Sequence, residues 1–173
     1  MNPAEGVMDI FLQPGECFVG DAGYRIRTLL GSCVSVTLWH PVKRIGAMSH
    51  FLLSSRDGNG RVFELDGRYG DEAMWLLLRD LVAAGVAPAE CKAKIFGGGN
   101  MFPGRHKTYH VNIGHGNGET ARRLLRSYGI PILSESLFGV GHRNIIFDVA
   151  TGDVWSRQIK PVPAPPRLVK ECA

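Results

Sequence analysis

Hydrophobic and polar positions alternate along most of the chain, which is the pattern typical of β-strands. Strands are predicted over residues 7–12, 16–19, 26–30, 33–39, 45–53, 92–96, 130–133, 143–149 and 154–159. Short sequences rich in Pro, Gly, Asp and Asn separate many of these runs and predict turns. The turn at residues 150–153 joins the last two runs into a hairpin.

Two segments instead carry hydrophobic residues at every third or fourth position, which predicts amphipathic helices. The first covers residues 71–84 and is followed by Gly85, a residue type that commonly ends helices. The second covers residues 118–128, with Asn117 as its N-cap and Gly129 at its end. Because strands dominate, we expect a mixed α/β fold in which helices cover one face of a largely antiparallel sheet.

The length and composition of the chain indicate one ordinary globular domain. It has 173 residues, of which 45% are hydrophobic and 21% charged. We expect this domain over residues 1–160, followed by an extended, proline-rich tail over 161–173. No apolar run approaches the ~18–20 residues that cross a membrane, and the first residues lack the layout of a secretory signal. We therefore expect no membrane span and a cytoplasmic location.

The charged residues and the histidines argue against two classes of site. The formal net charge is +4, and Lys and Arg occur singly or in pairs without aromatic residues between them, so nucleic-acid binding is not predicted. His106, His110 and His115 lie close together in the sequence, but neighbouring Pro and Gly residues disfavour a helix that would bring them to one face. We therefore predict no metal site.

The four cysteines have to be interpreted one by one. Cys17, Cys33, Cys91 and Cys172 are too far apart for a CxxC motif, and a disulfide framework is not expected in a reducing compartment. Cys17 and Cys91 are interpreted as structural, and Cys172 lies in the tail without a lipidation motif. Cys33 differs from the others because a histidine follows it on the next predicted strand.

A hairpin formed by residues 33–39 and 45–53 brings that cysteine and histidine together. If Trp39 and Arg44 flank a four-residue turn, Cys33 and His50 face each other directly, and a thiol and an imidazole at such positions are within reach. The alternative is a small buried cysteine near a hydrogen-bonded histidine. In the catalytic interpretation, the flexible step at Gly31 and Ser32 presents backbone N–H groups to an oxyanion.

A glycine run at residues 97–99 follows the strand predicted over 92–96. It is not a phosphate-binding loop, because the Gly-Lys-Ser/Thr sequence is absent. Two interpretations remain open for it. It is a tight turn, or it forms a wall of the active site or substrate groove, in which case Gly98 and Gly99 belong to the site.

Several motifs resemble the CheD family, the chemoreceptor glutamine deamidases of bacterial and archaeal chemotaxis. The likeness begins with Gly31-Ser32-Cys33-Val34-Ser35-Val36 and with His50 in Gly46-Ala47-Met48-Ser49-His50-Phe51-Leu52-Leu53. It continues in residues 93–102, in Asn112-Ile113-Gly114-His115-Gly116-Asn117 and in Gly139-Val140-Gly141-His142-Arg143. These motifs follow the order of the family and span about residues 7 to 160.

The resemblance implies an α/β/β sandwich of mixed, mostly antiparallel sheets with two main helices, related to the catalytic domains of deamidating toxins. It also implies a Cys–His–Thr triad in which Cys33 is the nucleophile and His50 the base. Thr28 is the nearest suitable third member, although some relatives carry the threonine at the position of Arg27. The implied enzyme is a protein-glutamine glutaminase that forms a thioester on Cys33 and needs no cofactor.

The implied partners are the cytoplasmic helices of chemoreceptors, the phosphatase CheC and, through it, the response regulator CheY. Two other functions stay open at this point. One is a different cysteine amidohydrolase with another protein substrate, and the other is a non-catalytic adaptor that binds receptors or CheC.

Overall fold

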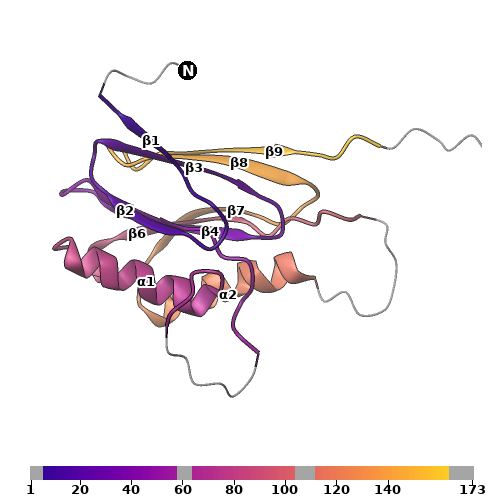
Figure 1. Ribbon diagram of the computed structural model, residues 1–173, viewed down its shortest axis with the longest axis horizontal. Coiled ribbons are helices and arrows are strands. Elements are labelled where there is room, and N and C mark those ends of the chain that lie inside the picture. Colours follow the sequence, from indigo (N-terminus) through magenta and orange to yellow (C-terminus); the bar gives the residue numbers. More distant parts are fainter. Residues whose placement is uncertain (1–5, 58–63, 104–111, 164–173) are drawn as a thin grey trace, which may run out of the picture.

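The computed structural model describes residues 6–57, 64–103 and 112–163, which form three stacked layers (Figure 1). A four-stranded sheet forms one outer layer, a five-stranded sheet the middle one, and two α-helices the third. The strands are β1 Met8–Phe11, β2 Cys17–Gly20, β3 Tyr24–Leu30, β4 Val34–His40, β5 Ile45–Ser49, β6 Lys92–Gly97, β7 Ile132–Leu137, β8 His142–Asp148 and β9 Val154–Ile159. The helices are α1 Gly70–Ala83, α2 Ile113–Ser127 and a short 3-10 turn, Pro88–Glu90.

Both sheets are mixed and mostly antiparallel. The four-stranded sheet has the order β1-β3-β8-β9 and the five-stranded sheet the order β2-β5-β4-β6-β7. Among the strands of the described residues, β1–β3 and β6–β7 pair in parallel and the other pairs are antiparallel. The α/β/β sandwich is therefore confirmed. Periodicity alone predicted one sheet, because alternation shows that a strand has two faces but not which strands share a sheet.

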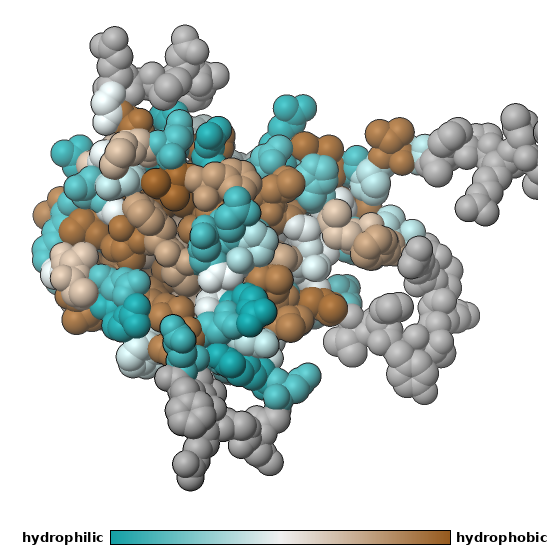
Figure 2. Space-filling model, in the orientation of Figure 1, coloured by the Kyte–Doolittle hydropathy of each residue, from teal (hydrophilic) through white to brown (hydrophobic). Residues whose placement is uncertain are grey.

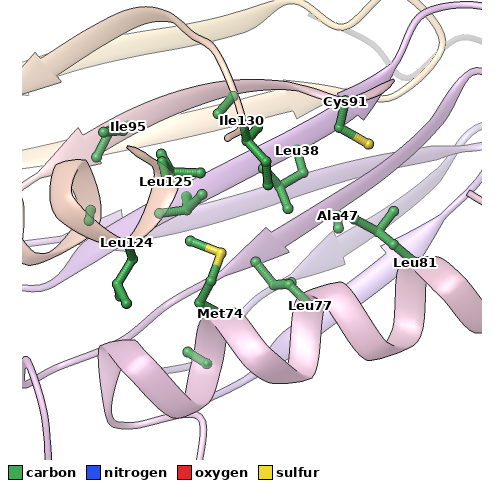
Figure 3. Close-up of a cluster of buried hydrophobic side chains, with 14 of the residues drawn as sticks. Leu38, Ala47, Met74, Leu77, Leu81, Cys91, Ile95, Leu124, Leu125 and Ile130 are labelled. Carbon is green, nitrogen blue, oxygen red and sulfur yellow. The ribbon is translucent and has the colours of Figure 1, made fainter. Parts of the chain in front are cut away.

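Two hydrophobic clusters hold the layers together, one on each face of the five-stranded sheet. Between this sheet and the helices, Met74, Leu77 and Leu81 point from α1 toward Leu38 and Ala47 of the sheet (Figure 3). The second cluster lies between the two sheets. It contains Leu12, Ile26, Leu30, Met48, Phe96, Ile145, Phe147 and Val149, with Cys33 packed against it.

The alternation along β4 decides which side chains enter which cluster. Val34, Val36 and Leu38 face the helices, as predicted. Cys33 and Trp39 pack on the opposite side, between the sheets. This placement matters for the site, because it puts the Cys33 side chain in the layer between the sheets.

The predicted register of the β4–β5 hairpin is wrong by two residues. Trp39 pairs with Gly46 and His40 with Ile45, so the four-residue turn covers residues 41–44 rather than 40–43. Arg44 closes this turn in a left-handed conformation (φ 49°), and its N–H donates to the His40 carbonyl. Because the error is an even number of residues, Cys33 and His50 stay on the same face of the sheet.

Helix α2 begins five residues before its predicted start. Asn112, not Asn117, is the N-cap, and its side chain accepts a hydrogen bond from the N–H of His115. The first turn is rich in glycine and looks like a loop in the sequence. Gly114 is required there because a Cβ would lie 2.6 Å from the Gly98 carbonyl oxygen.

Other boundaries shift by smaller amounts. The predicted strands over 7–12 and 16–19 are present, but β1 and β2 lie in different sheets, on either side of a turn in which Gly15 has φ 87°. Strand β7 ends four residues beyond its predicted end. The prediction stopped too early because the central residues are polar, and they are tolerated there because the edge strand exposes them. The final hairpin, β8 and β9 around residues 150–153, is confirmed.

On the face drawn in Figure 2, hydrophobic residues gather at the level of the two sheets, toward the left, with hydrophilic residues interspersed. None of the helices in the described ranges is long and apolar enough to cross a membrane. His106, His110 and Cys172 lie outside the described residues, as do residues 58–63 and most of the proline-rich tail.

Candidate active site

The three predicted catalytic residues come from adjoining parts of the two sheets. Thr28 lies on β3 between Ile26 and Leu30, both of which belong to the cluster between the sheets. His50 follows β5 directly, and Cys33 precedes β4 directly. Thr28 and His50 are only 3% and 2% exposed, whereas Cys33 is half-buried. The site therefore combines a buried threonine and histidine with a half-buried cysteine.

A chain of two hydrogen bonds fixes the imidazole of His50. The Thr28 hydroxyl donates to the carbonyl of Leu12 at 2.7 Å and lies 2.8 Å from Nδ1 of His50. A hydroxyl has a single proton, so when it donates to Leu12 it accepts from Nδ1–H. The neutral ring then carries its proton on Nδ1 and has its lone pair on Nε2. That is the tautomer a general base needs if Nε2 is to take a proton.

The structure also distinguishes Thr28 from Arg27, the position at which some relatives carry the threonine. Arg27 is on the outer face of β3, where its guanidinium lies 3.5 Å from a carboxylate oxygen of Asp9. The residue that contacts His50 is therefore Thr28.

Cys33 and His50 are diagonal neighbours rather than a directly opposed pair. Val34 bridges to Phe51, which places His50 opposite Ser35 and puts Cys33 one position beyond the bridge. Diagonal positions on one face of a sheet are about 7–8 Å apart, within reach of an aromatic ring. His50 Nε2 is buried and has no hydrogen-bond partner among the described residues. It is thus free to interact with a thiol or a substrate atom.

Burial keeps both groups neutral in the free protein. It lowers the pKa of His50 to about 4, although the Leu12 carbonyl and the charge of Glu16 act in the opposite direction. Burial also raises the pKa of the Cys33 thiol, and the residue's own backbone N–H offsets part of this effect. The resting pair is therefore a thiol and a neutral imidazole, and the proton moves only when the thiol reacts.

The backbone around Cys33 is held by the glycine run. The N–H of Gly98 donates to the Cys33 carbonyl at 2.8 Å, and the N–H of Gly99 donates to the Gly31 carbonyl at 2.9 Å. These two N–H groups are therefore occupied, so Gly98 and Gly99 support the loop through their backbone. That Gly98 and Gly99 also line the substrate groove stays a prediction. No room exists for side chains there, because a Cβ at Gly99 would lie 2.4 Å from the carbonyl oxygen of Gly141.

The N–H groups of Ser32 and Cys33 differ from those of the glycines. Within residues 6–57, 64–103 and 112–163, no acceptor is bonded to either of them. They remain available as donors beside the thiol. Gly31 is in close contact with the side chain of Met101, since a Cβ there would lie 3.1 Å from the Met101 sulfur.

Three buried polar residues that the sequence did not place in the site lie beside it, and two of them support its backbone. The buried Asn117 donates to the carbonyls of Ser32 and Leu52. The buried Arg143 donates to the carbonyls of Gly97 and Phe138 and so anchors the glycine run. Ser35, opposite His50, is fully buried and its hydroxyl has no partner among the described residues. Asn117 and Arg143 end motifs quoted for the family resemblance, which is the signal that could have pointed to them.

The remaining candidates have structural surroundings. Cys91 is buried in the helix-side cluster, and burial raises the pKa of Cys17 to about 12. Both thiols therefore stay protonated and inert. His115 is exposed on α2, where its ring stacks on Phe138 at 4.8 Å.

Comparison with known proteins identifies the family. Residues 52–158 match the family described as CheD chemotactic sensory transduction. The chain is 61% identical over 162 residues to the "Probable chemoreceptor glutamine deamidase CheD 2" of Albidiferax ferrireducens, covering 94% of each chain. The chain belongs to the CheD family.

More distant CheD proteins match over similar lengths. The "Probable chemoreceptor glutamine deamidase CheD" of Pseudomonas savastanoi pv. phaseolicola is 46% identical, covering 91% of this chain and 88% of its own. Among solved structures, the Neisseria meningitidis protein NMB0706 matches with a TM-score of 0.42 and 13% identity, over 78% of this chain and 63% of that one.

Proposed function

We propose that this CheD protein is a cysteine-dependent deamidase that converts specific Gln side chains of methyl-accepting chemotaxis receptors to Glu, with release of ammonia. The observation that carries the proposal is the buried hydrogen bond between Thr28 and His50, on the same inter-sheet side as Cys33. It leaves a neutral imidazole with an unpartnered Nε2 in the layer that also holds the half-buried Cys33 thiol. The names of the related CheD proteins supply the substrate class.

In the first half of the reaction, His50 Nε2 takes the proton of the Cys33 thiol as the sulfur attacks the carboxamide carbon of a receptor Gln. A tetrahedral intermediate forms, and its oxygen gains a negative charge. The N–H groups of Ser32 and Cys33 donate to that oxygen. The protonated His50 then gives its proton to the departing nitrogen, which leaves as ammonia and yields a thioester on Cys33.

In the second half, His50 takes a proton from water, and the hydroxide attacks the thioester carbonyl. The C–S bond breaks, the product is Glu, and the proton returns to the Cys33 sulfur. Thr28 keeps Nδ1 protonated in every step and so keeps Nε2 as the proton-transfer atom. This route uses only side chains and backbone groups of the chain and water, without a metal or an organic cofactor.

The family resemblance extends the proposal to the setting of the reaction. The substrate is the cytoplasmic helical part of a chemoreceptor, so the protein acts in the cytoplasm. CheC is the proposed regulatory partner, and through it CheY. We place the deamidase domain in residues 1–160 and the proline-rich tail in 161–173.

Replacing Cys33 with Ala tests the chemistry directly. A receptor fragment is incubated with the wild-type or the variant protein, and mass spectrometry follows conversion of Gln to Glu at each position. We expect conversion by the wild type and none by Cys33→Ala, while binding of the fragment persists. Undiminished conversion by the variant would rule out the cysteine mechanism. Binding without any conversion by the wild type would instead identify a receptor adaptor.

A further inference from the structure

Asn117 is an unusual residue for the interior of a helix. It lies in the second turn of α2 and is only 1% exposed. Asparagine is a weak helix former, and burying an amide is unfavourable unless its hydrogen-bonding groups are paired. Its presence therefore requires specific partners.

Those partners lie on both sides of the candidate site. The Asn117 Nδ2 donates to the carbonyl of Ser32 at 3.1 Å and to the carbonyl of Leu52 at 2.7 Å, which uses both of its protons. Its Oδ1 accepts from the hydroxyl of Ser54 at 3.3 Å. One side chain thus joins the residue before Cys33 to the segment that follows His50.

The hydrogen bond to the Ser32 carbonyl also sets the direction of the Cys33 N–H. The Ser32 C=O and the Cys33 N–H belong to one planar trans peptide group and point in opposite directions. Holding the carbonyl toward α2 therefore directs the Cys33 N–H away from the helix. This N–H has no acceptor among the described residues.

The preceding peptide group is oriented in the same way by a different element. Gly99 holds the Gly31 carbonyl, and the N–H of that peptide group belongs to Ser32. Two successive N–H groups beside the thiol are therefore each oriented by a hydrogen bond to the carbonyl of the same peptide group. Gly99 makes its contact with a backbone N–H and tolerates no side chain. Of the two hydrogen bonds, the one from Asn117 is therefore the one that a side-chain substitution can remove without distorting the backbone.

We propose that Asn117 is a positioning residue that aims the Cys33 N–H at the oxyanion of the tetrahedral intermediate. This inference rests on the proposed deamidase function and concerns the same site. It assigns to the buried amide an effect on the transition state, in addition to tying α2 to the sheet.

The effect is measurable because two reactions of Cys33 differ in their need for an oxyanion donor. Deamidation builds negative charge on a carbonyl oxygen, whereas alkylation by iodoacetamide displaces iodide at a saturated carbon and builds none there. An Asn117 variant should therefore lose deamidation while its thiol keeps its ordinary reactivity. A variant that merely loosens the fold or moves the nucleophile would lose both.

The test compares Asn117→Ala and Asn117→Asp with the wild type. In Asn117→Ala a water can occupy the space between the two carbonyls, so this variant is expected to fold. In Asn117→Asp a carboxylate faces both carbonyls, so the Ser32 peptide group is expected to turn. We expect kcat for deamidation to fall by about 10-fold in Asn117→Ala and about 100-fold in Asn117→Asp, while KM changes by less than about threefold.

Thiol reactivity is measured on the same samples, with mass spectrometry following the peptide that contains Cys33. We expect the alkylation rate to stay within about threefold of the wild type. Thr120→Val is the matched control, since it changes a buried polar residue one turn further along α2. It should leave both rates unchanged.

Three results would overturn the inference: an unchanged kcat in a folded Asn117 variant, an equal loss of deamidation and alkylation, or a rise in KM alone. Each differs from failure of the proposed function, in which the wild type itself converts no Gln.

Discussion

The two faces of strand β4 are built for different tasks. Toward the helices, Val34, Val36 and Leu38 enter a cluster made only of hydrophobic side chains. Toward the second sheet, the same strand presents Ser35 and Thr37, with Cys33 directly before it and His50 across from it. There, the Ser35 hydroxyl and His50 Nε2 are both buried without a partner in the described ranges.

This difference shows where the molecule derives stability and where it keeps reactive groups. An apolar face is stabilised by burial and close packing, and it gains nothing from a polar atom. A buried polar atom without a partner is unfavourable, and such atoms persist where a reaction needs them. We therefore expect substitutions on the helix face to change stability and substitutions between the sheets to change activity. Four predictions test this contrast, from the largest expected effect to the smallest.

The helix face should dominate stability. Leu77 on α1 is fully buried in the helix-side cluster, and Leu77→Ala should lower the free energy of unfolding by about 2–5 kcal/mol through lost burial and a cavity. Urea unfolding measures this change, and Val82→Ala on the exposed side of the same helix is the control, with an effect within about 0.5 kcal/mol. Deamidation per folded molecule should stay unchanged in both. A loss of activity without a loss of stability in Leu77→Ala would refute the division between the faces.

Acid should destabilise the protein through the inter-sheet layer. The pKa of His50 is about 4 in the folded protein and about 6.5 when unfolded, so between these values the unfolded chain binds more protons. Stability is therefore lost as the pH falls from 6.5 to 4, by up to about 3 kcal/mol. Urea unfolding over this pH range measures the loss. Carboxylates of low pKa also lower the free energy of unfolding at more acidic pH, so His50→Asn is the control. Its free energy of unfolding should change less between pH 6.5 and 4 than that of the wild type.

Thr28 should affect turnover more than folding. Thr28→Val keeps the shape of the side chain but leaves Nδ1 of His50 without its acceptor, so the proton is no longer fixed on that nitrogen. We expect kcat to fall by about 10- to 100-fold, with a smaller change in KM. Thr28→Ser retains the hydroxyl and should recover most of the activity. Equal activities of the Val and Ser variants would remove Thr28 from the proposed triad.

Ser35 should give the smallest effect and the sharpest comparison of the two faces. Its buried hydroxyl has no partner among the described residues, so Ser35→Ala should leave stability unchanged or raise it by less than about 1 kcal/mol. When the His50 ring is charged during catalysis, the hydroxyl is positioned to accept a hydrogen bond from Nε2–H, so we expect kcat to fall a few-fold in the same variant. A clear destabilisation in Ser35→Ala would show that the hydroxyl is hydrogen-bonded and stabilises the fold. That result would contradict the expected difference between the two faces.

The sequence predicted most elements, because their signals are local. Nearly all strands and both helices follow from periodicity and turn residues, and α2 is misplaced only where its glycine-rich first turn imitates a loop. The pairing of Cys33 with His50 on one face was also predicted, since an even error in register leaves the face unchanged. The division of the strands between two sheets was not predicted from periodicity, because it depends on contacts between distant segments.

The amino-acid sequence by itself therefore determined the alternation that sends Cys33 and Val34 to opposite sides of the sheet, along with the motifs that place this chain in the CheD family. Only the tertiary structure decided that Thr28 rather than Arg27 meets His50, and that Asn117 holds the peptide before Cys33. Those contacts join segments separated by 22 and 85 positions in the chain. Their geometry is set by the stacking of two sheets and a helix, and no local pattern of residues encodes such stacking.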